Sequence, residues 1–184
     1  MKSIKSIISL ILILAASNIV SAQIFSSSNA NIGFYSETPL ENIAAESNVG
    51  VILVNTKTGD IVAKVQNTSF SFRNMLMQEH FNEKYMESEK FPHSLFVGKF
   101  IEGVDFSKNG SYDVSVVGKL TIHGVEQNRT IKGTLIVDDN KIQLKSVFLV
   151  KNKDHKIQIP DLVVTKIAED ITVKMDALLM IKEK

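Results

Sequence analysis

The chain lacks cysteine and tryptophan altogether. Without cysteine it can form neither disulfides nor a thiolate metal site. It also lacks an excess of charge of either sign, with 21 basic and 20 acidic residues among 184 and no basic block. The sequence therefore carries no electrostatic signature of a nucleic-acid-binding protein. The length favours one domain.

Beyond residue 22 the chain has no apolar run long enough for a membrane-spanning helix, so we expect no stable membrane insertion. The first 22 residues have a different character. Two lysines precede the apolar stretch Ile7–Ala16, and Val20–Ala22 ends in the small-residue pattern that a signal peptidase cuts after. We predict that residues 1–22 are a cleaved signal peptide, which implies a periplasmic or secreted protein. The alternative is a buried or anchoring N-terminal helix.

The stretch Ser111–Val137 carries the strongest structural signal. Apolar residues such as Val114, Val116 and Leu120 alternate with polar ones, which is the pattern of a strand with one dry and one wet face. A second alternating run follows after a short polar segment, Glu126–Asn128. The pattern predicts two long amphipathic strands joined as a hairpin. The dry face of this hairpin must be covered by the rest of the chain.

The same alternation predicts strands along most of the remaining sequence. Residues 23–31 are rich in serine and asparagine and are interpreted as a flexible lead-in, and Leu40–Ser47 could be a strand or a short helical turn. The other predicted strands are Ile32–Ser36, Val49–Asn55, Ile61–Gln66, Leu95–Ile101, Ile142–Val150 and Glu169–Ile181.

One short helix interrupts the strands. Met77, Phe81 and Tyr85 recur every four residues and would share one helical face. Asn74 is a suitable N-cap, and Pro92 marks a boundary because the residue before proline avoids helical angles.

About eight strands joined mostly by short turns form either an up-and-down antiparallel barrel or a sandwich. Glycines inside the long strands, Gly98, Gly118 and Gly133, favour a curved sheet. We therefore predict an all-β, antiparallel up-and-down β-barrel of about eight strands, with one short helix, over residues 32–184.

The interior of such a barrel is either filled by side chains or holds one small ligand, and periodicity alone does not decide between them. If a ligand binds there, the inward-facing strand residues would line its site, and the helix segment would border the entrance. The predicted ligand-binding residues are Phe72, Met77, Phe81, Phe91, Tyr112, Val114, Val116, Leu120, Ile131, Leu135, Leu144, Phe148, Val173 and Met175.

Several segments resemble the YceI-like family. Gly118–Val125, GKLTIHGV, is similar to the GxLTIHGVTK signature of that family, and Met77–Phe96 is similar to its helix segment. Ile32–Ala44 resembles its first strand and turn, and Ile157–Pro160 resembles a late IKIP-like stretch. The resemblance departs at Glu126–Asn128, where the family has Thr-Lys-Pro.

The resemblance spans roughly residues 32–181 and implies an elongated, lipocalin-like barrel with the helix beside its opening. It also implies a periplasmic or secreted protein that binds an apolar, amphiphilic molecule, in known cases a polyisoprenoid. For this chain the resemblance favours a ligand cavity over a packed core as the content of the barrel. The expected partner is a polyisoprenoid or fatty-acid-like lipid. We expect the protein to bind it as a monomer or homodimer, without a cofactor and without catalysing a reaction.

Two other classes of function are alternatives to lipid binding. The histidines His80, His93, His123 and His155 lie apart, and neither a HExxH motif nor a GxSxG motif occurs, so no metal site or hydrolase is predicted. His80 is expected to hold the start of the helix and His123 to lie at a hairpin end.

The second alternative is an interaction module with a self-filled core. It would bind a partner protein through a strand edge or through the helical face of Met77, Phe81 and Tyr85. The competing interpretation is that these three side chains plug one end of the barrel.

Overall fold

The computed structural model describes residues 23–182. The predicted signal peptide, residues 1–22, lies outside this range. The elements in chain order are β1 (Ile24–Glu37), β2 (Asn42–Asn55), β3 (Asp60–Gln66), η1 (Asn67–Ser69), β4 (Ser71–Phe72), α2 (Met75–His80), η2 (Phe81–Tyr85), β5 (His93–Phe100), β6 (Gly110–Ile122), β7 (Val125–Asp138), β8 (Lys141–Lys151), η3 (Asn152–His155), η4 (Asp161–Val163) and β9 (Asp170–Ile181).

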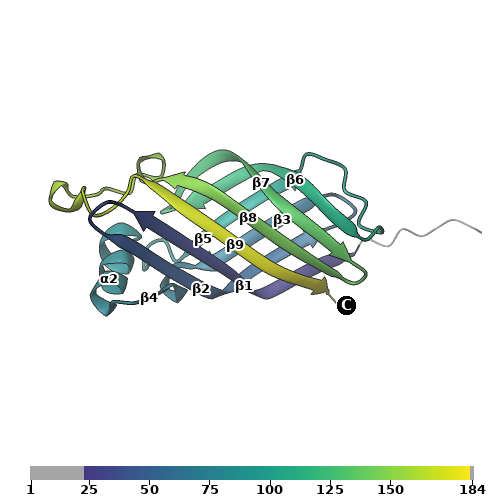
Figure 1. The fold of residues 1–184 in the computed structure, drawn as a ribbon, viewed down its shortest axis with the longest axis horizontal. Helices are drawn as coiled ribbons and strands as arrows, with labels where there is room; N and C mark the ends of the chain where they lie inside the picture. Colours follow the sequence, from purple (N-terminus) through teal and green to yellow (C-terminus); the bar gives the residue numbers. More distant parts are fainter. Residues whose placement is uncertain (1–22, 183–184) are drawn as a thin grey trace, which may run out of the picture.

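Eight antiparallel strands close into a barrel (Figure 1). Their order is β1-β9-β8-β7-β6-β5-β3-β2, and β1 also pairs with β2, which closes the ring. The two-residue strand β4 adds only a short pairing to β2. Because neighbours in the sheet are neighbours in sequence, the topology is up-and-down, as predicted.

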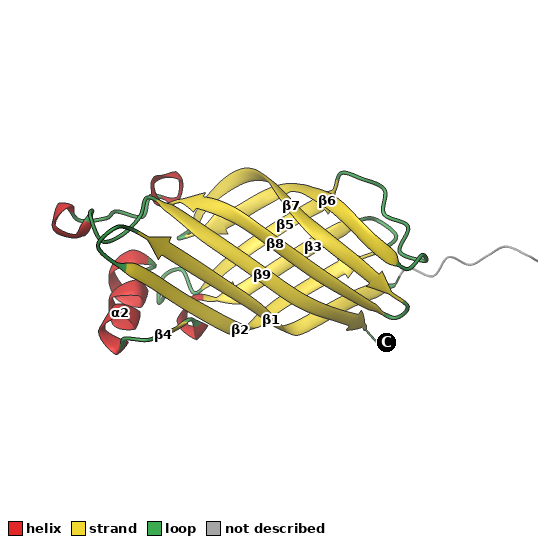
Figure 2. Cartoon of the chain, viewed as in Figure 1, coloured by secondary structure: helices red, strands yellow, loops and turns green. Residues whose placement is uncertain are grey.

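The helical segment lies at one end of the barrel, together with the β1–β2 turn and the loop between β8 and β9 (Figure 2). We call this the α2 end. The first residues of β1, the last residues of β9, the β2–β3 turn and the β7–β8 turn lie at the opposite end. None of the helices in the described range is long and apolar enough to cross a membrane.

The β6–β7 hairpin confirms the main prediction from the sequence. The two strands pair without interruption from Gly110 with Val137 to Ile122 with Val125. Most of their apolar residues face inward and are buried or partly buried, whereas Val117 and Ile136 are exposed on the outer face. The turn needs left-handed backbone angles, and His123 and Gly124 have φ of 51° and 70°.

The prediction that residues 23–31 form a flexible lead-in is wrong. Residues 24–31 form the first part of β1, where Phe25 pairs with Val54 and Ile181 and is only 1% exposed. The serines and asparagines around it hide the strand signal, because they contribute no apolar alternation. These residues are ordered by closure of the barrel, since β1 has a partner on both sides.

The β2 region is one strand where the sequence suggested two. Asn42–Asn55 runs through Gly50, which lies beside a register shift in the β1–β2 pairing. A side chain at Gly50 would place its Cβ 2.9 Å from the carbonyl oxygen of Ala30. Glycine therefore allows the irregular stretch of β1 to stay close to β2.

The helical segment begins as predicted, but only its first part is α-helical. The Asn74 side chain accepts a hydrogen bond from the backbone N–H of Leu76, which caps α2. The α-helical part ends at His80, and the chain continues through one π-helical turn, Phe81–Tyr85. A π-helical turn is wider than an α-helical turn. The side chains after His80 are therefore rotated away from the single line that regular α-helical spacing would give them.

The end of the barrel opposite α2 is filled by its own side chains. Large residues from five strands are at most 1% exposed there, and they belong to one apolar cluster: Phe25, Ile52, Leu135, Ile142 and Leu179. This end is a packed core rather than a tunnel.

Candidate functional site

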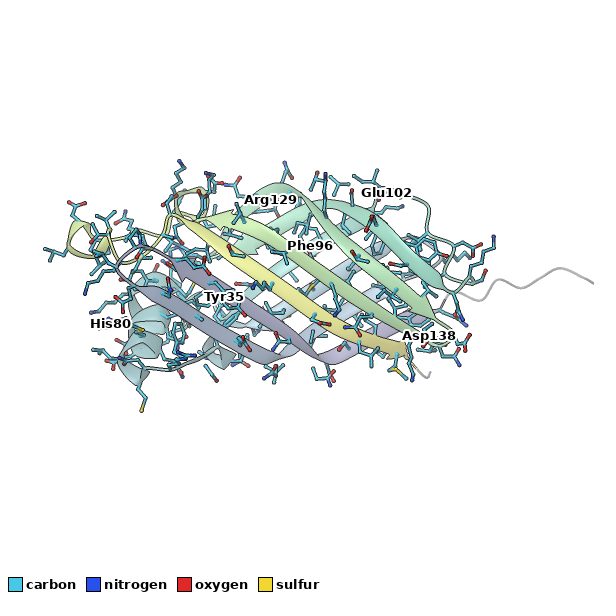
Figure 3. The ribbon with its side chains drawn as sticks, in the orientation of Figure 1. Tyr35, His80, Phe96, Glu102, Arg129 and Asp138 are labelled. Carbon is cyan, nitrogen blue, oxygen red and sulfur yellow. The ribbon has the colours of Figure 1, made fainter. Side chains whose placement is uncertain are left out.

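A cavity of about 440 Å³ lies in the half of the barrel nearest α2. All eight barrel strands contribute to its walls, with further residues from α2, η2 and the loop between β8 and β9. Its volume falls in the range of small-molecule sites, roughly 300–1,000 Å³. The interior is thus divided along its axis into a solid end and a hollow end. In Figure 3, His80 marks the α2 end of the barrel and Asp138 the opposite end.

Most of the predicted ligand-binding residues border this cavity. They come from four strands of the barrel wall and from the helical segment with the short strand before it. The eleven are Phe72, Met77, Phe81, Val114, Val116, Leu120, Ile131, Leu144, Phe148, Val173 and Met175.

Three predicted residues do not border it. Leu135 is fully buried in the solid end, and Tyr112 packs against the same core while its hydroxyl donates to the Lys108 carbonyl oxygen at 2.9 Å. Phe91 instead packs edge-on against the ring of His123, with centroids 4.8 Å apart. Alternation identifies the inward face of a strand but gives no depth along the barrel axis, which explains Tyr112 and Leu135.

Four phenylalanines form an aromatic cluster between the helical segment and the barrel wall. Phe34, Phe70, Phe72 and Phe81 have ring centroids 5.1–5.8 Å apart, and Phe34 stacks on Phe81. All four border the cavity. Phe34 and Phe70 were missing from the predicted site. The parity that Phe34 shares with Ile32 could have identified it.

Part of the wall carried no periodic signal at all. The loop between β8 and β9 contributes apolar side chains to the cavity, namely Ile157, Ile159, Val163 and Ile167. Within this loop only the short 3-10 turns η3 and η4 are regular. Tertiary packing alone brings these residues over the α2 end.

The helical face of Met77, Phe81 and Tyr85 points inward. All three border the cavity and are partly buried. This arrangement agrees with the interpretation that they plug the end of the barrel. It disagrees with their use as a free surface for a partner protein.

The buried polar side chains of the wall are bonded to the protein itself. The amide of Asn67 donates to the Phe91 carbonyl oxygen at 2.6 Å, and its own oxygen accepts from the Ser94 hydroxyl at 2.8 Å. The Ser146 hydroxyl donates to the Lys132 carbonyl oxygen at 2.6 Å.

The same holds near the loop between β8 and β9. The Ser36 hydroxyl accepts from the backbone N–H of Ala168 at 2.8 Å, and the Asn152 amide donates to the Ala168 carbonyl oxygen at 3.0 Å. Within residues 23–182, the one buried side-chain polar atom without a partner is Nε2 of His155, which does not border the cavity. The cavity therefore offers a ligand mainly apolar contact.

A charged pair lies at the edge of the cavity. The Lys166 ammonium is 4.0 Å from a Glu41 carboxylate oxygen, and both residues border the cavity while remaining partly exposed. Such an exposed, long contact is weak in water. These two groups are thus available to the polar end of a bound molecule.

The four histidines lie at separate places. His80 ends α2 and borders the cavity, so its expected position at the helix start is wrong; His123 lies in the β6–β7 turn, as predicted. His93 is exposed, whereas His155 is fully buried and its burial lowers its pKa. Among the described residues, no three His, Cys, Asp or Glu side chains group closely enough to hold a metal ion.

The comparison with known families identifies the chain. The sequence matches the YceI-like domain over residues 25–179. The chain belongs to the YceI-like family. No curated protein matched it.

Solved structures of similar fold include other YceI-like proteins. A polyisoprenoid-binding domain from Saccharophagus degradans has 13% identity and a TM-score of 0.75, with 88% of this chain and 100% of that chain covered. BcnA from Burkholderia cenocepacia has 15% identity and a TM-score of 0.67, covering 82% and 95%. The YceI protein of Campylobacter jejuni has 16% identity and a TM-score of 0.55, covering 73% and 81%. At these identities the likeness establishes the fold.

The two segments that most resemble the YceI-like family meet in the structure. Nε2 of His123, in the turn after β6, lies 2.6 Å from a Glu87 carboxylate oxygen, and Nδ1 of His123 lies 3.2 Å from the His155 carbonyl oxygen. The Phe91 ring packs on the same imidazole and on Gly124, where any Cβ would lie 2.3 Å from it. His123 therefore ties the helical segment and the β8–β9 loop to the barrel.

Proposed function

We propose that this YceI-like protein binds the hydrocarbon part of a lipid, such as a polyisoprenoid or a fatty acid, inside the cavity. The observation that carries the proposal is an apolar cavity of about 440 Å³ whose buried polar groups are already bonded to the protein. Burying each CH₂ group contributes about 0.8 kcal/mol, so a tail can bind without strong polar contacts. The polyisoprenoid-binding neighbour of similar fold supports this ligand class.

The proposed binding is non-enzymatic. The lining is dominated by aliphatic and aromatic side chains, and the charged pair Glu41 and Lys166 lies only at its edge. We place the protein in the periplasm or outside the cell, on the signal-peptide pattern of residues 1–22. Lipid extracted from protein purified from its native host and identified by mass spectrometry would test the ligand class directly.

Two tryptophan variants of β6 test the site. Val116 is buried at the cavity wall, and the next residue, Val117, is half exposed on the outer face. Val116→Trp should fill the cavity and weaken binding of a fluorescent fatty acid or of geranylgeraniol by about tenfold or more, equivalent to about 1.4 kcal/mol. Val117→Trp should leave the affinity unchanged.

Titration of both variants and of the unmodified protein gives the answer. Circular dichroism would establish that each variant keeps its fold. Equal affinity in Val116→Trp and Val117→Trp would place the lipid elsewhere. Absence of any lipid from the native protein, with no binding below millimolar concentration, would end the proposal.

A further inference from the structure

The barrel wall has a seam between β7 and β8. Each of these two strands pairs along almost its full length with its other neighbour in the sheet, β7 with β6 and β8 with β9. With each other they pair only from Gly133 with Ser146 to Asp138 with Lys141, next to their turn. Val125–Lys132 and Val147–Lys151 thus face each other without a backbone ladder. Figure 1 shows β7 arching away from β8 at the top of the view.

Side chains bridge the seam in place of the ladder. Nη2 of Arg129, on β7, donates to the carbonyl oxygen of Leu149 on β8. The Ser146 hydroxyl of β8 donates to the Lys132 carbonyl oxygen of β7 at 2.6 Å, at the point where the two strands separate. These bonds satisfy backbone groups that a regular sheet would pair directly.

Two further bridges close the α2 end of the seam. The Gln127 amide donates to the Asp154 carbonyl oxygen at 2.7 Å, and Nδ1 of His155 lies 3.0 Å from the Val125 carbonyl oxygen. Here the partner of β7 is η3 and not β8. Side chains can rotate away from a carbonyl without disturbing any strand pairing, so the seam can widen while both halves of the sheet stay intact.

The cavity extends to both sides of the seam. Ile131 and Gly133 border it from β7, and Phe148 and Val150 border it from β8. Lys132 also borders it, although its neighbours in the strand are the inward-facing residues. The cavity therefore reaches the plane of the wall at this position.

On its β8 side, the outer surface beside the seam is apolar. Val147 and Leu149 of β8 are 63% and 52% exposed. They lie on the outward face of the strand, whereas Ser146 lies on the inward face. The α2 end of the barrel, in contrast, is occupied by the aromatic cluster, in which Phe34 stacks on Phe81. A hydrocarbon chain that approaches from the side meets apolar surface outside the wall and apolar lining within it.

We propose that this seam is the side entrance of the cavity, through which the hydrocarbon chain of a lipid enters while its polar end stays outside. Arg129 is the positioning residue that holds the entrance closed by its bond to Leu149. The inference rests on the proposed lipid-binding function and adds the route and the control of access.

Crosslinking provides the test, because the chain has no cysteine of its own. The β7–β8 register ends at Gly133 and Ser146; continued across the seam, it would place Thr130 opposite Leu149, and both are exposed. A Thr130→Cys/Leu149→Cys variant would be bridged across the seam with a flexible bismaleimide. The matched control is Thr134→Cys/Lys145→Cys, which bridges the same two strands at a position where they already pair.

The measurement is the rate at which each protein takes up cis-parinaric acid, a fluorescent fatty acid, before and after crosslinking. The seam crosslink should slow uptake about tenfold or more, whereas the control crosslink should leave the rate within about twofold. Equal rates with and without the seam crosslink would overturn the entrance while leaving lipid binding in place. An unmodified protein that takes up no lipid would overturn the proposed function, and the entrance with it.

Variants of Arg129 test its role separately. Arg129→Ala removes the bridge and should speed uptake and release several-fold, with the amount of lipid bound at saturation unchanged. Arg129→Lys can still donate to the Leu149 carbonyl oxygen and should restore slow exchange. A loss of thermal stability in Arg129→Ala without any change in exchange rates would make Arg129 merely structural and would overturn its assignment.

Discussion

At the scale of single residues, the close approach of two backbones explains why Gly118, the first residue of the family motif GKLTIHGV, is a glycine. Gly118, on β6, lies against β5, and a Cβ there would be 2.3 Å from the carbonyl oxygen of Val97. No rotamer change can relieve a clash between a Cβ and a backbone oxygen. Strand pairing at this point therefore requires glycine.

Gly118→Ala should destabilise the protein by about 1–3 kcal/mol, the usual cost of forcing extra volume into a packed site. Urea unfolding would measure the change in the free energy of unfolding. Gly103 gives a matched control, because a Cβ there would meet nothing within 4 Å. An equal loss of stability in Gly103→Ala would show that the cost does not come from the close contact at Gly118.

We expect His155 to make the stability of the protein depend on pH. It is fully buried, and desolvation lowers its pKa below the ordinary value of about 6.5. The folded state therefore favours neutral imidazole, while the unfolded chain takes up a proton near pH 6.5. The stability that this residue contributes is complete above pH 6.5 and is lost as the pH falls through the lowered pKa of the folded state.

Thermal unfolding between pH 7.5 and 5 would reveal this contribution. In His155→Asn the side-chain amide can still donate a hydrogen bond but does not titrate, so the loss of stability on acidification should be smaller than in the unmodified protein. Parallel pH curves for His155→Asn and the unmodified protein would contradict the assignment.

At the scale of elements, the helical segment at the α2 end depends on contacts outside itself. Its α-helical part has only six residues and contains no buried residue, so it depends on its cap and on packing. The cap is Asn74, and the packing comes from the aromatic cluster and from the tie between Glu87 and His123. Spacing predicted the helix and its start; the π-helical turn after His80 depends on tertiary packing.

Asn74→Ala should weaken α2 by about 1 kcal/mol, because the Leu76 N–H loses its acceptor. Hydrogen exchange of residues 75–85 should become about fivefold faster, while exchange in β6 and β7 stays unchanged. Asn74→Asp keeps a capping oxygen and should behave like the unmodified protein. Uniformly faster exchange across the barrel would mean that Asn74 supports the whole fold rather than the helix.

At the scale of the whole molecule, the barrel combines a solid end and a hollow end. Leu135 belongs to the solid end, and Leu120, at the other end of the same hairpin, borders the cavity. Both are buried and lie on the inward face. Truncation at the solid end creates a new void, whereas truncation beside the cavity enlarges an existing one.

Leu135→Ala should cost about 2–5 kcal/mol of unfolding free energy with little effect on lipid affinity. Leu120→Ala should cost less stability but should change the affinity for a fatty acid. Urea unfolding and lipid titration of the two variants would test both expectations. Equal stability losses, with affinity unchanged in both, would contradict the division of the interior into two ends.

The sequence by itself determined the class of fold and the inward face of each long strand, because alternation with a period of two residues is a local property of extended chain. Val114, Val116 and Leu120 face the cavity as that pattern predicts. Its local signal also located the helix start at Asn74.

Only the tertiary structure decided which inward residues meet across the barrel and which surround empty space. Tyr112 and Val114 share a parity, yet only Val114 borders the cavity, because depth along the axis depends on how the opposite walls approach each other. Closure likewise turned the polar residues 24–31 into strand. The seam beside Arg129 depends on how far β7 and β8 stay together, a distance between strands that no single strand's residues encode.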